Sequence, residues 1–370
     1  MRNFTAVGTF GFNGEETKFP WLRTGTTKGK DSYQSMSFSV IAAKNNRVFV
    51  SVFGSKGKEI KTMDTDNKKI TIAWNDRFDP DVVNNVASYT KFVANLTGDD
   101  RKEFISGWDF IEYLKENKTI LDTERFIVRG RIRPSIYNDK VNLSFDVTGI
   151  FKADENVQNK IEVSMEYFYS ADDIDLSDFK DEKKVYLNGY TSEYLPDVGT
   201  KYLPIQTVLN CSKLDENNEN HMNRRNFMFR LLGINSADNK LSVGLKKKSV
   251  YKLGIICSYN NGAEEVEFDE STLTPTQKMS IELGLNTIDD FKPKGQIYGN
   301  RSITYNIKQF NLSKYPDGCE NTEMTISEFE SEVFSQGSGK KAETVADVEK
   351  KAAGGESETY SDADIDDLFS

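Results

Sequence analysis

The chain has 370 residues and a formal net charge of −10; 37% of its residues are hydrophobic and 12% are aromatic. This length suggests two domains, and the apolar content is sufficient for each to form a core. No run of 18 or more apolar residues is present, so the sequence predicts no membrane-spanning helix. The single histidine, His221, excludes a histidine-based catalytic triad and a histidine metal pair.

The cysteines and the first residues indicate a reducing compartment. Cys211, Cys257 and Cys319 are widely separated, which favours free thiols over a disulfide framework. Their spacing with His221 matches no zinc pattern. The first 16 residues lack the apolar core of a signal peptide. We therefore expect a cytoplasmic protein that holds no metal and no cofactor.

In the first half of the chain, alternating, β-branched and aromatic residues predict strands that are interrupted by two helices. The first helix is expected over residues 82–93, where valine and tyrosine recur with helical spacing after Pro80. The second helix is expected to begin after Ser106, a residue type that caps helices well. The predicted strands cover residues 4–12, 35–43, 47–53, 69–74, 125–132 and 141–151.

In the second half the strand pattern starts again, and Thr274 with Pro275 marks the start of one further helix. No sequence repeat relates the two halves. Many short, aromatic-rich strands with a few short helices predict a mainly β (α+β) fold of OB-like barrels. We expect two β-rich domains, residues 1–155 and 160–334, and then a disordered linker and acidic tail over residues 335–370. The predicted strands of this half cover residues 161–169, 184–194, 202–209, 226–232 and 250–258, with a strand pair in 296–310.

The charge is distributed unevenly along the chain. Residues 18–77 hold 12 Lys and Arg against five Asp and Glu, and residues 224–252 hold eight against one. Residues 335–370 hold nine acids against four bases. Two concentrated positive regions and an acidic end are typical of a polyanion-binding protein that carries its own competitor.

Aromatic and basic side chains are interleaved in the first positive region and on a later strand. Single-stranded nucleic acid is bound by cations along its phosphates and by flat rings that stack on its bases. Phe49 and Phe53 are predicted to share one strand face, because side chains two residues apart point the same way. The alternative is that Phe49, Phe53 and Trp74 line the barrel core. The candidate DNA-binding residues are Trp21, Arg23, Lys28, Lys30, Arg47, Phe49, Phe53, Lys56, Lys58, Trp74, Arg77, Arg129 and Arg131.

The last fifteen residues, 356–370, hold six carboxylates, no Lys or Arg, and a terminal Leu-Phe-Ser. Such a segment cannot bury enough apolar surface to order itself. Two large apolar side chains near its tip favour a peptide that docks on another protein, and the alternative is a frayed acidic terminus. The predicted partner-binding residues are Asp362, Asp364, Asp366, Asp367, Leu368 and Phe369.

Together, the acidic aromatic-tipped tail and the N-terminal set of aromatic and basic strands resemble the OB-fold single-stranded DNA-binding proteins of tailed bacteriophages. Bacterial members of this class usually end in Pro-Phe, whereas here Leu368 and Phe369 are followed by Ser370. The resemblance implies a non-enzymatic role in phage DNA replication or recombination, in the cytoplasm of the host cell. It also implies that the tail recruits a replication or recombination protein, such as a polymerase, a helicase or primase, or a sliding clamp.

The leading hypothesis is a protein that coats single-stranded DNA through aromatic stacking and a basic groove, with residues 1–155 as the DNA-binding domain and a tail that competes with DNA. A β-rich phage structural or assembly protein with an acidic docking tail is one alternative. A strand-annealing recombination protein is another.

Overall fold

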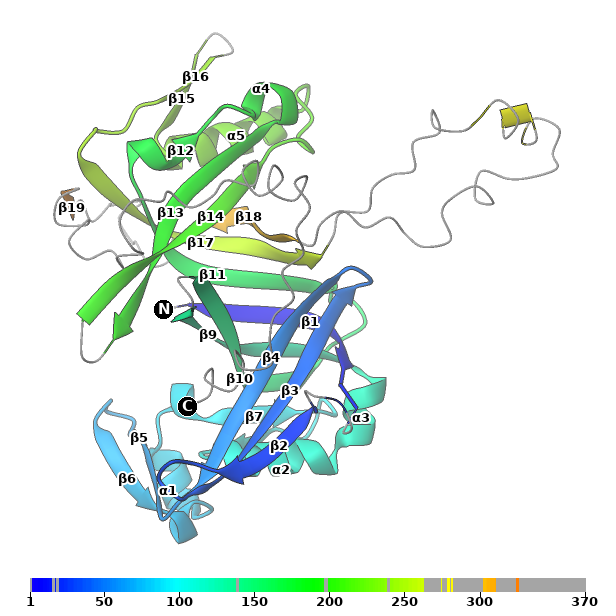
Figure 1. The fold of residues 1–370 in the computed structure, drawn as a ribbon, viewed down its shortest axis with the longest axis vertical. Helices are drawn as coiled ribbons and strands as arrows, with labels where there is room; N and C mark the ends of the chain where they lie inside the picture. The colour runs from blue at the N-terminus through cyan, green and yellow to red at the C-terminus, as the bar shows by residue number, and fades with distance from the viewer. Residues whose placement is uncertain are drawn as a thin grey trace.

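The computed structural model describes residues 2–14, 17, 20–137, 140–195, 199–237, 240–262, 274, 278–279, 281, 302–310 and 324–325. The fold is mainly β with a few short helices, as predicted (Figure 1). The predicted linker and acidic tail lie outside the described residues, as do Cys319 and most of the helix expected after Thr274.

The first half of the chain forms a closed, OB-like barrel of five strands. Around the barrel, β1 pairs with β3, β3 with β4, β4 with β10, β10 with β9, and β9 again with β1. Every pair is antiparallel except β4 and β10. The strands are β1 (Asn3–Gly11), β3 (Ser32–Ala43), β4 (Asn46–Lys56), β9 (Arg125–Tyr137) and β10 (Lys140–Lys152).

The second half repeats the same order of strands in a second barrel. There β11 pairs with β13, β13 with β14, β14 with β18, β18 with β17, and β17 with β11. The pair formed by the third and fifth strands, β14 and β18, is again parallel. The strands are β11 (Lys160–Tyr169), β13 (Lys184–Leu195), β14 (Gly199–Asn210), β17 (Ser249–Gly262) and β18 (Ser302–Phe310).

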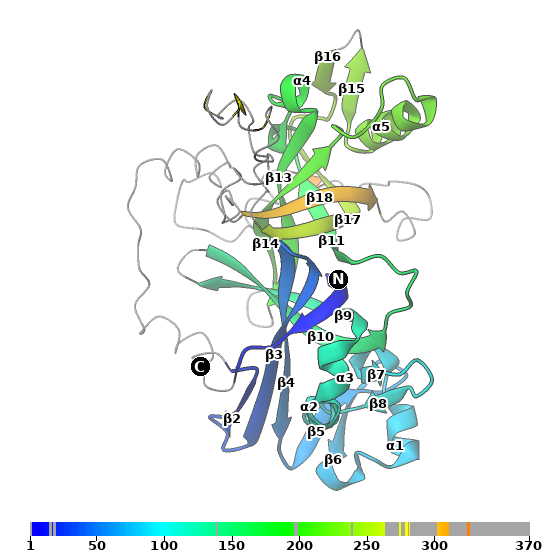
Figure 2. The same cartoon turned by 90° about the vertical axis from the view of Figure 1, so that its right-hand side faces the viewer.

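The two barrels are joined through β1. The first part of one edge of β1 pairs with β11 of the second barrel, and the last part pairs with β3. Gly8 lies between these two stretches, where a Cβ atom would be 2.1 Å from the carbonyl oxygen of Ile41. Asn46 adds a second connection, because its side-chain amide donates a hydrogen bond to the carbonyl oxygen of Tyr259 on β17. Figure 2 shows the barrels stacked along the long axis of the molecule.

The barrel cores follow from the alternation of side chains along the strands. On β3, Met36, Phe38 and Val40 are buried, while the residues between them face outward or lie at the barrel surface. Most of the buried apolar residues of the two barrels belong to one continuous cluster. Phe145 of the first barrel and Tyr259 of the second meet edge to face, with ring centroids 5.4 Å apart.

A helix between the third and fourth strands packs against the core of each barrel. In the first barrel this is α2 (Gly107–Glu116), and Ser106 caps it as predicted by accepting a hydrogen bond from the backbone N–H of Asp109. In the second barrel it is α5 (Glu219–Leu231), capped by Asn218. The strand predicted over residues 226–232 is therefore wrong, because a short apolar run does not distinguish a buried strand from the buried side of a helix.

The helix predicted over residues 82–93 is also wrong. The helix α1 (Pro80–Asn85) ends early, and Val86 is extended and forms a bridge with Asp64. The valines that suggested a long helix instead pack on the hairpin of β5 (Glu59–Met63) and β6 (Lys69–Ala73), around the buried side chain of Ile72. Tertiary packing of β-branched side chains overrides their helical spacing here.

The remaining elements are short. None of the helices in the described ranges is long and apolar enough to cross a lipid bilayer. The remaining short strands and helices are β2 (Leu22–Thr26), β7 (Phe92–Asn95), β8 (Lys102–Phe104), α3 (Lys118–Thr123), β12 (Ile174–Asp175), α4 (Phe179–Glu182), β15 (Ile234–Ala237), β16 (Lys240–Val243) and β19 (Met324–Thr325).

Candidate nucleic-acid interface

Exposed aromatic rings lie on the outer face of β4, as the alternation predicts. Phe49 and Phe53 are 55% and 54% exposed, whereas Val48, Val50 and Val52 between and beside them are buried in the barrel. The structure therefore contradicts the alternative in which these two phenylalanines line the core. Large apolar side chains that are about half exposed to solvent on a strand are candidates for contacts with a flat ligand.

Tyr33 of β3 adds a third ring that the sequence interpretation missed. It stacks on Phe53 with 5.7 Å between ring centroids and 24° between planes. The register explains the contact, because Ser35 is the partner of Phe53 and Tyr33 is the next outward residue on β3. The signal was present in the alternation of tyrosine and serine at residues 33, 35 and 37.

Cations border these rings. Arg47 precedes Phe49 on the same outer face, and Lys56 and Lys58 follow Phe53 at the end of β4. Lys28 and Lys30 are exposed in the turn between β2 and β3. Across the described ranges, none of these five side chains forms an ion pair with a carboxylate. Their positive charge is not paired with a carboxylate there, although the ammonium group of Lys56 also lies 5.9 Å from the centre of the Trp108 ring.

Elsewhere on the first barrel, several cations are paired with carboxylates. Lys61 lies 3.6 Å from Glu59, and Lys91 lies 3.0 Å from Glu103. Two hydrogen bonds, from Arg101 with the larger effect and from Lys91 with the smaller, hold the pKa of Glu103 below its usual value. Within the described part of the chain, the surface of β2, β3 and β4 is distinguished by several unpaired cations beside exposed rings, a combination that composition alone does not locate.

Trp21 and Arg23 lie at the border of this surface. The Trp21 ring is half-buried and meets Phe12 edge to face at 5.7 Å, with the ammonium group of Lys118 5.4 Å from its centre. Arg23 is half-buried on β2, in the same row as Ser35 and Phe53.

Trp74 and Arg77 form a structural cluster, which corrects their assignment as a stacking residue and a phosphate contact. Trp74 is only 9% exposed, and the guanidinium carbon of Arg77 lies 4.3 Å from its ring centre. Arg77 also pairs with Asp109 at 2.9 Å and donates a hydrogen bond to the Trp74 carbonyl oxygen. A base cannot reach a ring that is buried and covered in this way.

Arg129 and Arg131 lie on the outer face of β9, on the far side of β10. Asp146 of β10 is the register partner of both Ser51 on β4 and Arg131, so Arg131 is two strands, or about 10 Å, from the aromatic strand. Arg131 donates a hydrogen bond to the carbonyl oxygen of Tyr89. Arg129 is exposed above the ring of Phe151, at 5.2 Å.

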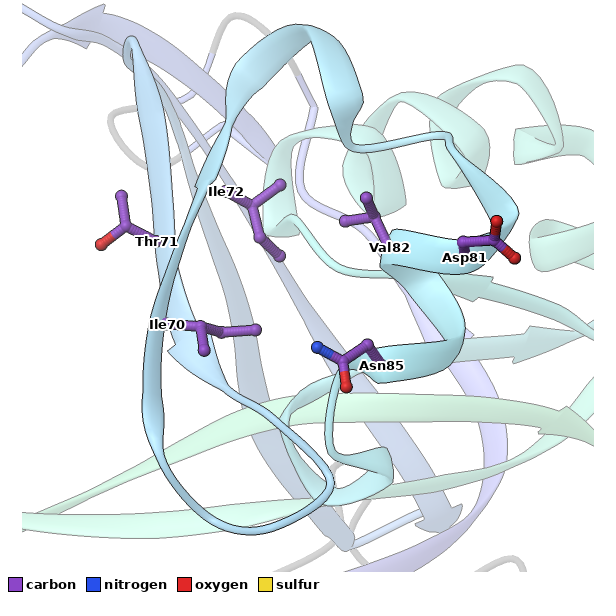
Figure 3. A pocket seen from close by; sticks show the side chains of 6 residues that line it. All are labelled: Ile70, Thr71, Ile72, Asp81, Val82 and Asn85. Atoms are coloured by element: carbon purple, nitrogen blue, oxygen red, sulfur yellow. The ribbon is translucent and has the colours of Figure 1, made fainter.

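A small pocket lies away from this surface, between β6 and α1 (Figure 3). Ile70 and Ile72 of β6 point toward Val82 and Asn85 of α1 in this view, and Asp81 lies at the end of the helix. The one carboxylate in its lining disfavours a phosphate ligand, and the lining holds no nucleophile with an adjacent base.

No protein-family model matches this sequence, and no curated protein matches it. Among solved structures, the chain is similar to the single-stranded DNA-binding protein from Thermus aquaticus. A deletion mutant of that protein shares 10% identity, with a TM-score of 0.28, over 74% of this chain and 97% of that chain. The wild-type protein shares 8% identity, with a TM-score of 0.29, over 70% of this chain and 85% of that chain. At TM-scores of 0.28 and 0.29, this similarity does not establish a shared function.

Proposed function

We propose that this protein binds single-stranded DNA across the outer face of β2, β3 and β4 without catalysing a reaction. One observation carries the proposal: exposed rings on β4 lie among cations that have no carboxylate partner in the described part of the chain. In OB-fold barrels, the face of the second and third strands binds oligonucleotides. Here those strands are β3 and β4.

The spacing of the rings suits an extended strand of DNA. Phe49 and Phe53 are four residues apart on β4, which separates them by about 13 Å. A base can stack on each ring while the phosphates on either side of the two rings run past Arg47 at one end, and past Lys56 and the lysines of the β2–β3 turn at the other. Each stacked base contributes about 1–3 kcal/mol, and each phosphate contact adds affinity that falls with salt.

We further propose that residues 356–370 compete with DNA for this surface. Their six carboxylates offer the same kind of charge as a phosphate chain, and displaced carboxylates become free to bind another protein. The sequence resemblance described above supports a place in phage DNA replication or recombination, where the tail recruits a partner protein. We also propose that the two barrels correspond to the two domains predicted at residues 1–155 and 160–334.

The decisive experiment is a titration of the full chain with fluorescent oligo-dT of about 10 nucleotides at two salt concentrations. We expect binding that weakens steeply with salt, and a loss of affinity of roughly 30-fold or more in the Phe49→Ala/Phe53→Ala variant. Phe78→Ala is the matched control, because Phe78 is 64% exposed but lies outside β2, β3 and β4, with its ring centre 4.1 Å from the guanidinium carbon of Arg77.

Absence of binding at both salt concentrations would overturn the proposal and favour a β-rich structural or assembly protein. Rapid pairing of complementary strands in the presence of the protein would favour a strand-annealing protein. For the tail, deletion of residues 356–370 should tighten binding, most of all at low salt. Unchanged or weaker binding after the deletion contradicts the competition.

A further inference from the structure

A second group of exposed cations lies on the second barrel. Arg224 and Arg230 are exposed on α5, Lys240 is exposed at the start of β16, and Lys247 and Lys248 are exposed between β16 and β17. We name this group of five side chains, together with Phe227, the α5 surface. It corresponds to the positive region found at residues 224–252, which the proposed function leaves without a role.

Like five cations on the surface of β2, β3 and β4, those of the α5 surface have no carboxylate partner in the part of the chain that the structure describes. Over the described residues, none of the five forms an ion pair with a carboxylate. Neighbouring lysines on the same barrel are paired, because Lys160 lies 2.8 Å from Glu162 and Lys183 lies 3.3 Å from Glu216. Lys180, Lys201 and Lys213 of this barrel also lack an ion pair among the described residues, but the α5 surface gathers five such cations on α5 and on the β16 segment and turn that follow it.

An aromatic ring lies within this charge. Phe227 is 39% exposed, and the guanidinium carbon of Arg230 is 5.5 Å from its ring centre. Arg224 and Arg230 are each three residues from Phe227 along the helix, so the three side chains are neighbours on the helix surface. Arg224 is held in place by a hydrogen bond to the carbonyl oxygen of Lys308 on β18, at 3.1 Å.

The α5 surface is far from the surface of β2, β3 and β4. In Figure 1, α5 and the β15–β16 hairpin lie at the top of the molecule, whereas β2 lies near the bottom. Figure 2 shows α5 and β2 on opposite sides as well. A ligand that contacts both surfaces must therefore be longer than one that occupies β2, β3 and β4 alone.

We propose that the α5 surface is a second contact for the phosphate backbone of the single-stranded DNA that binds at β2, β3 and β4. This inference rests on the proposed function, and it adds that long strands follow a path over both barrels. The combination of dispersed cations with a ring between two arginines fits a nucleic-acid strand, which offers a phosphate at each step and bases that stack.

The test uses the full chain with Lys240→Gln/Lys247→Gln/Lys248→Gln, and oligo-dT of about 10 and about 40 nucleotides. With the long oligomer, the variant should bind roughly tenfold more weakly at low salt. The slope of log K against log salt should fall by about 2, since each lost contact with a single strand removes about 0.7. With the short oligomer, its affinity should match that of the unmodified protein.

Lys61→Gln/Lys68→Gln/Lys160→Gln is the matched control. It removes the same charge from lysines that are already paired with carboxylates, so both oligomers should bind it nearly as they bind the unmodified protein. An equal loss in both triple variants would show a general effect of net charge and overturn the inference.

Two further results overturn the inference in other ways. Unchanged binding of the long oligomer to the α5 variant, with normal binding of the short one, refutes the second contact and leaves the proposed function intact. If the variant instead loses affinity only for a labelled peptide of residues 356–370, the α5 surface binds an acidic peptide and not DNA. Failure of the unmodified protein to bind the short oligomer refutes the proposed function itself.

Discussion

The two barrels have the same order of strands, but the outer faces of their second and third strands differ. On β3 and β4, Phe49 and Phe53 are exposed among unpaired cations. Near the corresponding face of the second barrel, Phe168 of β11 and Tyr202 of β14 are 6% and 7% exposed and meet edge to face at 4.8 Å, and Tyr194 near the end of β13 is exposed. The same fold thus carries two different surfaces, because the strand order fixes where a ligand face lies but not which side chains occupy it.

The charges on the two faces differ as well. Glu193 of β13 forms an ion pair with Arg2, and Lys252 of β17 lies 3.1 Å from Glu166. Burial lowers the pKa of Arg2 to about 10, so this guanidinium is still charged at neutral pH. Arg2 and Lys252 thus serve contacts within and between the barrels, whereas the five cations of the α5 surface form no ion pair among the described residues.

The largest expected effect is on the free energy of unfolding, after substitutions in the helices that pack against the two cores. Phe110 of α2 and Phe229 of α5 are 0% and 1% exposed, and alanine at either position should lower the free energy of unfolding by about 3–5 kcal/mol. Because the core and the sheet run through both barrels, each substitution should shift one common transition. Calorimetry of both variants measures this.

Two separate transitions, with one moved by Phe110→Ala and the other by Phe229→Ala, would show that the barrels unfold independently. The β1–β11 pairing would then not couple them. Leu96→Met, at a buried position where volume is nearly conserved, is a suitable control and should cost less than about 1.5 kcal/mol.

A smaller effect is expected from tyrosines on the two faces. Tyr33→Ala should weaken binding of a short oligo-dT roughly 5- to 100-fold, because it removes a ring that stacks on Phe53. Tyr194→Ala, on β13, should leave the affinity within about twofold, although Tyr194 is 68% exposed. Fluorescence anisotropy with the same oligomer compares them directly. Equal losses in the two variants would remove the distinction between the faces.

The smallest expected effect is the loss of the stability contribution of Glu103 at low pH. The pKa of Glu103 is lowered by Arg101 and Lys91 in the folded state, so its contribution to stability is present at neutral pH. That contribution is lost as the pH falls through the lowered pKa and the carboxylate takes up a proton. Glu103→Gln should therefore reduce stability by less than about 1 kcal/mol at pH 7, and the difference should be smaller at about pH 3. Urea titrations at the two pH values test this.

Unlike the stability contribution of Glu103, DNA affinity is expected to depend little on pH. The proposed contacts are lysines, arginines and phenylalanines, and the chain has one histidine. Binding of the short oligomer should therefore be nearly constant between about pH 6 and pH 8, where lysine and arginine stay charged. A steep change in this range would place a titrating group in the surface and contradict its composition.

The sequence by itself determined the mainly β character of the chain, the start of α2 at Ser106 and the outward direction of Phe49 and Phe53. These follow from local rules, because strand alternation and helix capping depend on residues near one another in the chain. The positive charge of residues 18–77 and 224–252 is likewise a property of composition.

Only the tertiary structure decided the rest. Whether Trp74 is exposed depends on Arg77 and Asp109, and whether Tyr33 stacks on Phe53 depends on the register of two strands. The repeated strand order of the two barrels left no repeat in the sequence, since long-range pairing can be satisfied by many sets of apolar side chains. Which cations are unpaired also follows from long-range neighbours, and in each of the two candidate DNA surfaces several cations without an ion pair in the described ranges lie near an exposed ring.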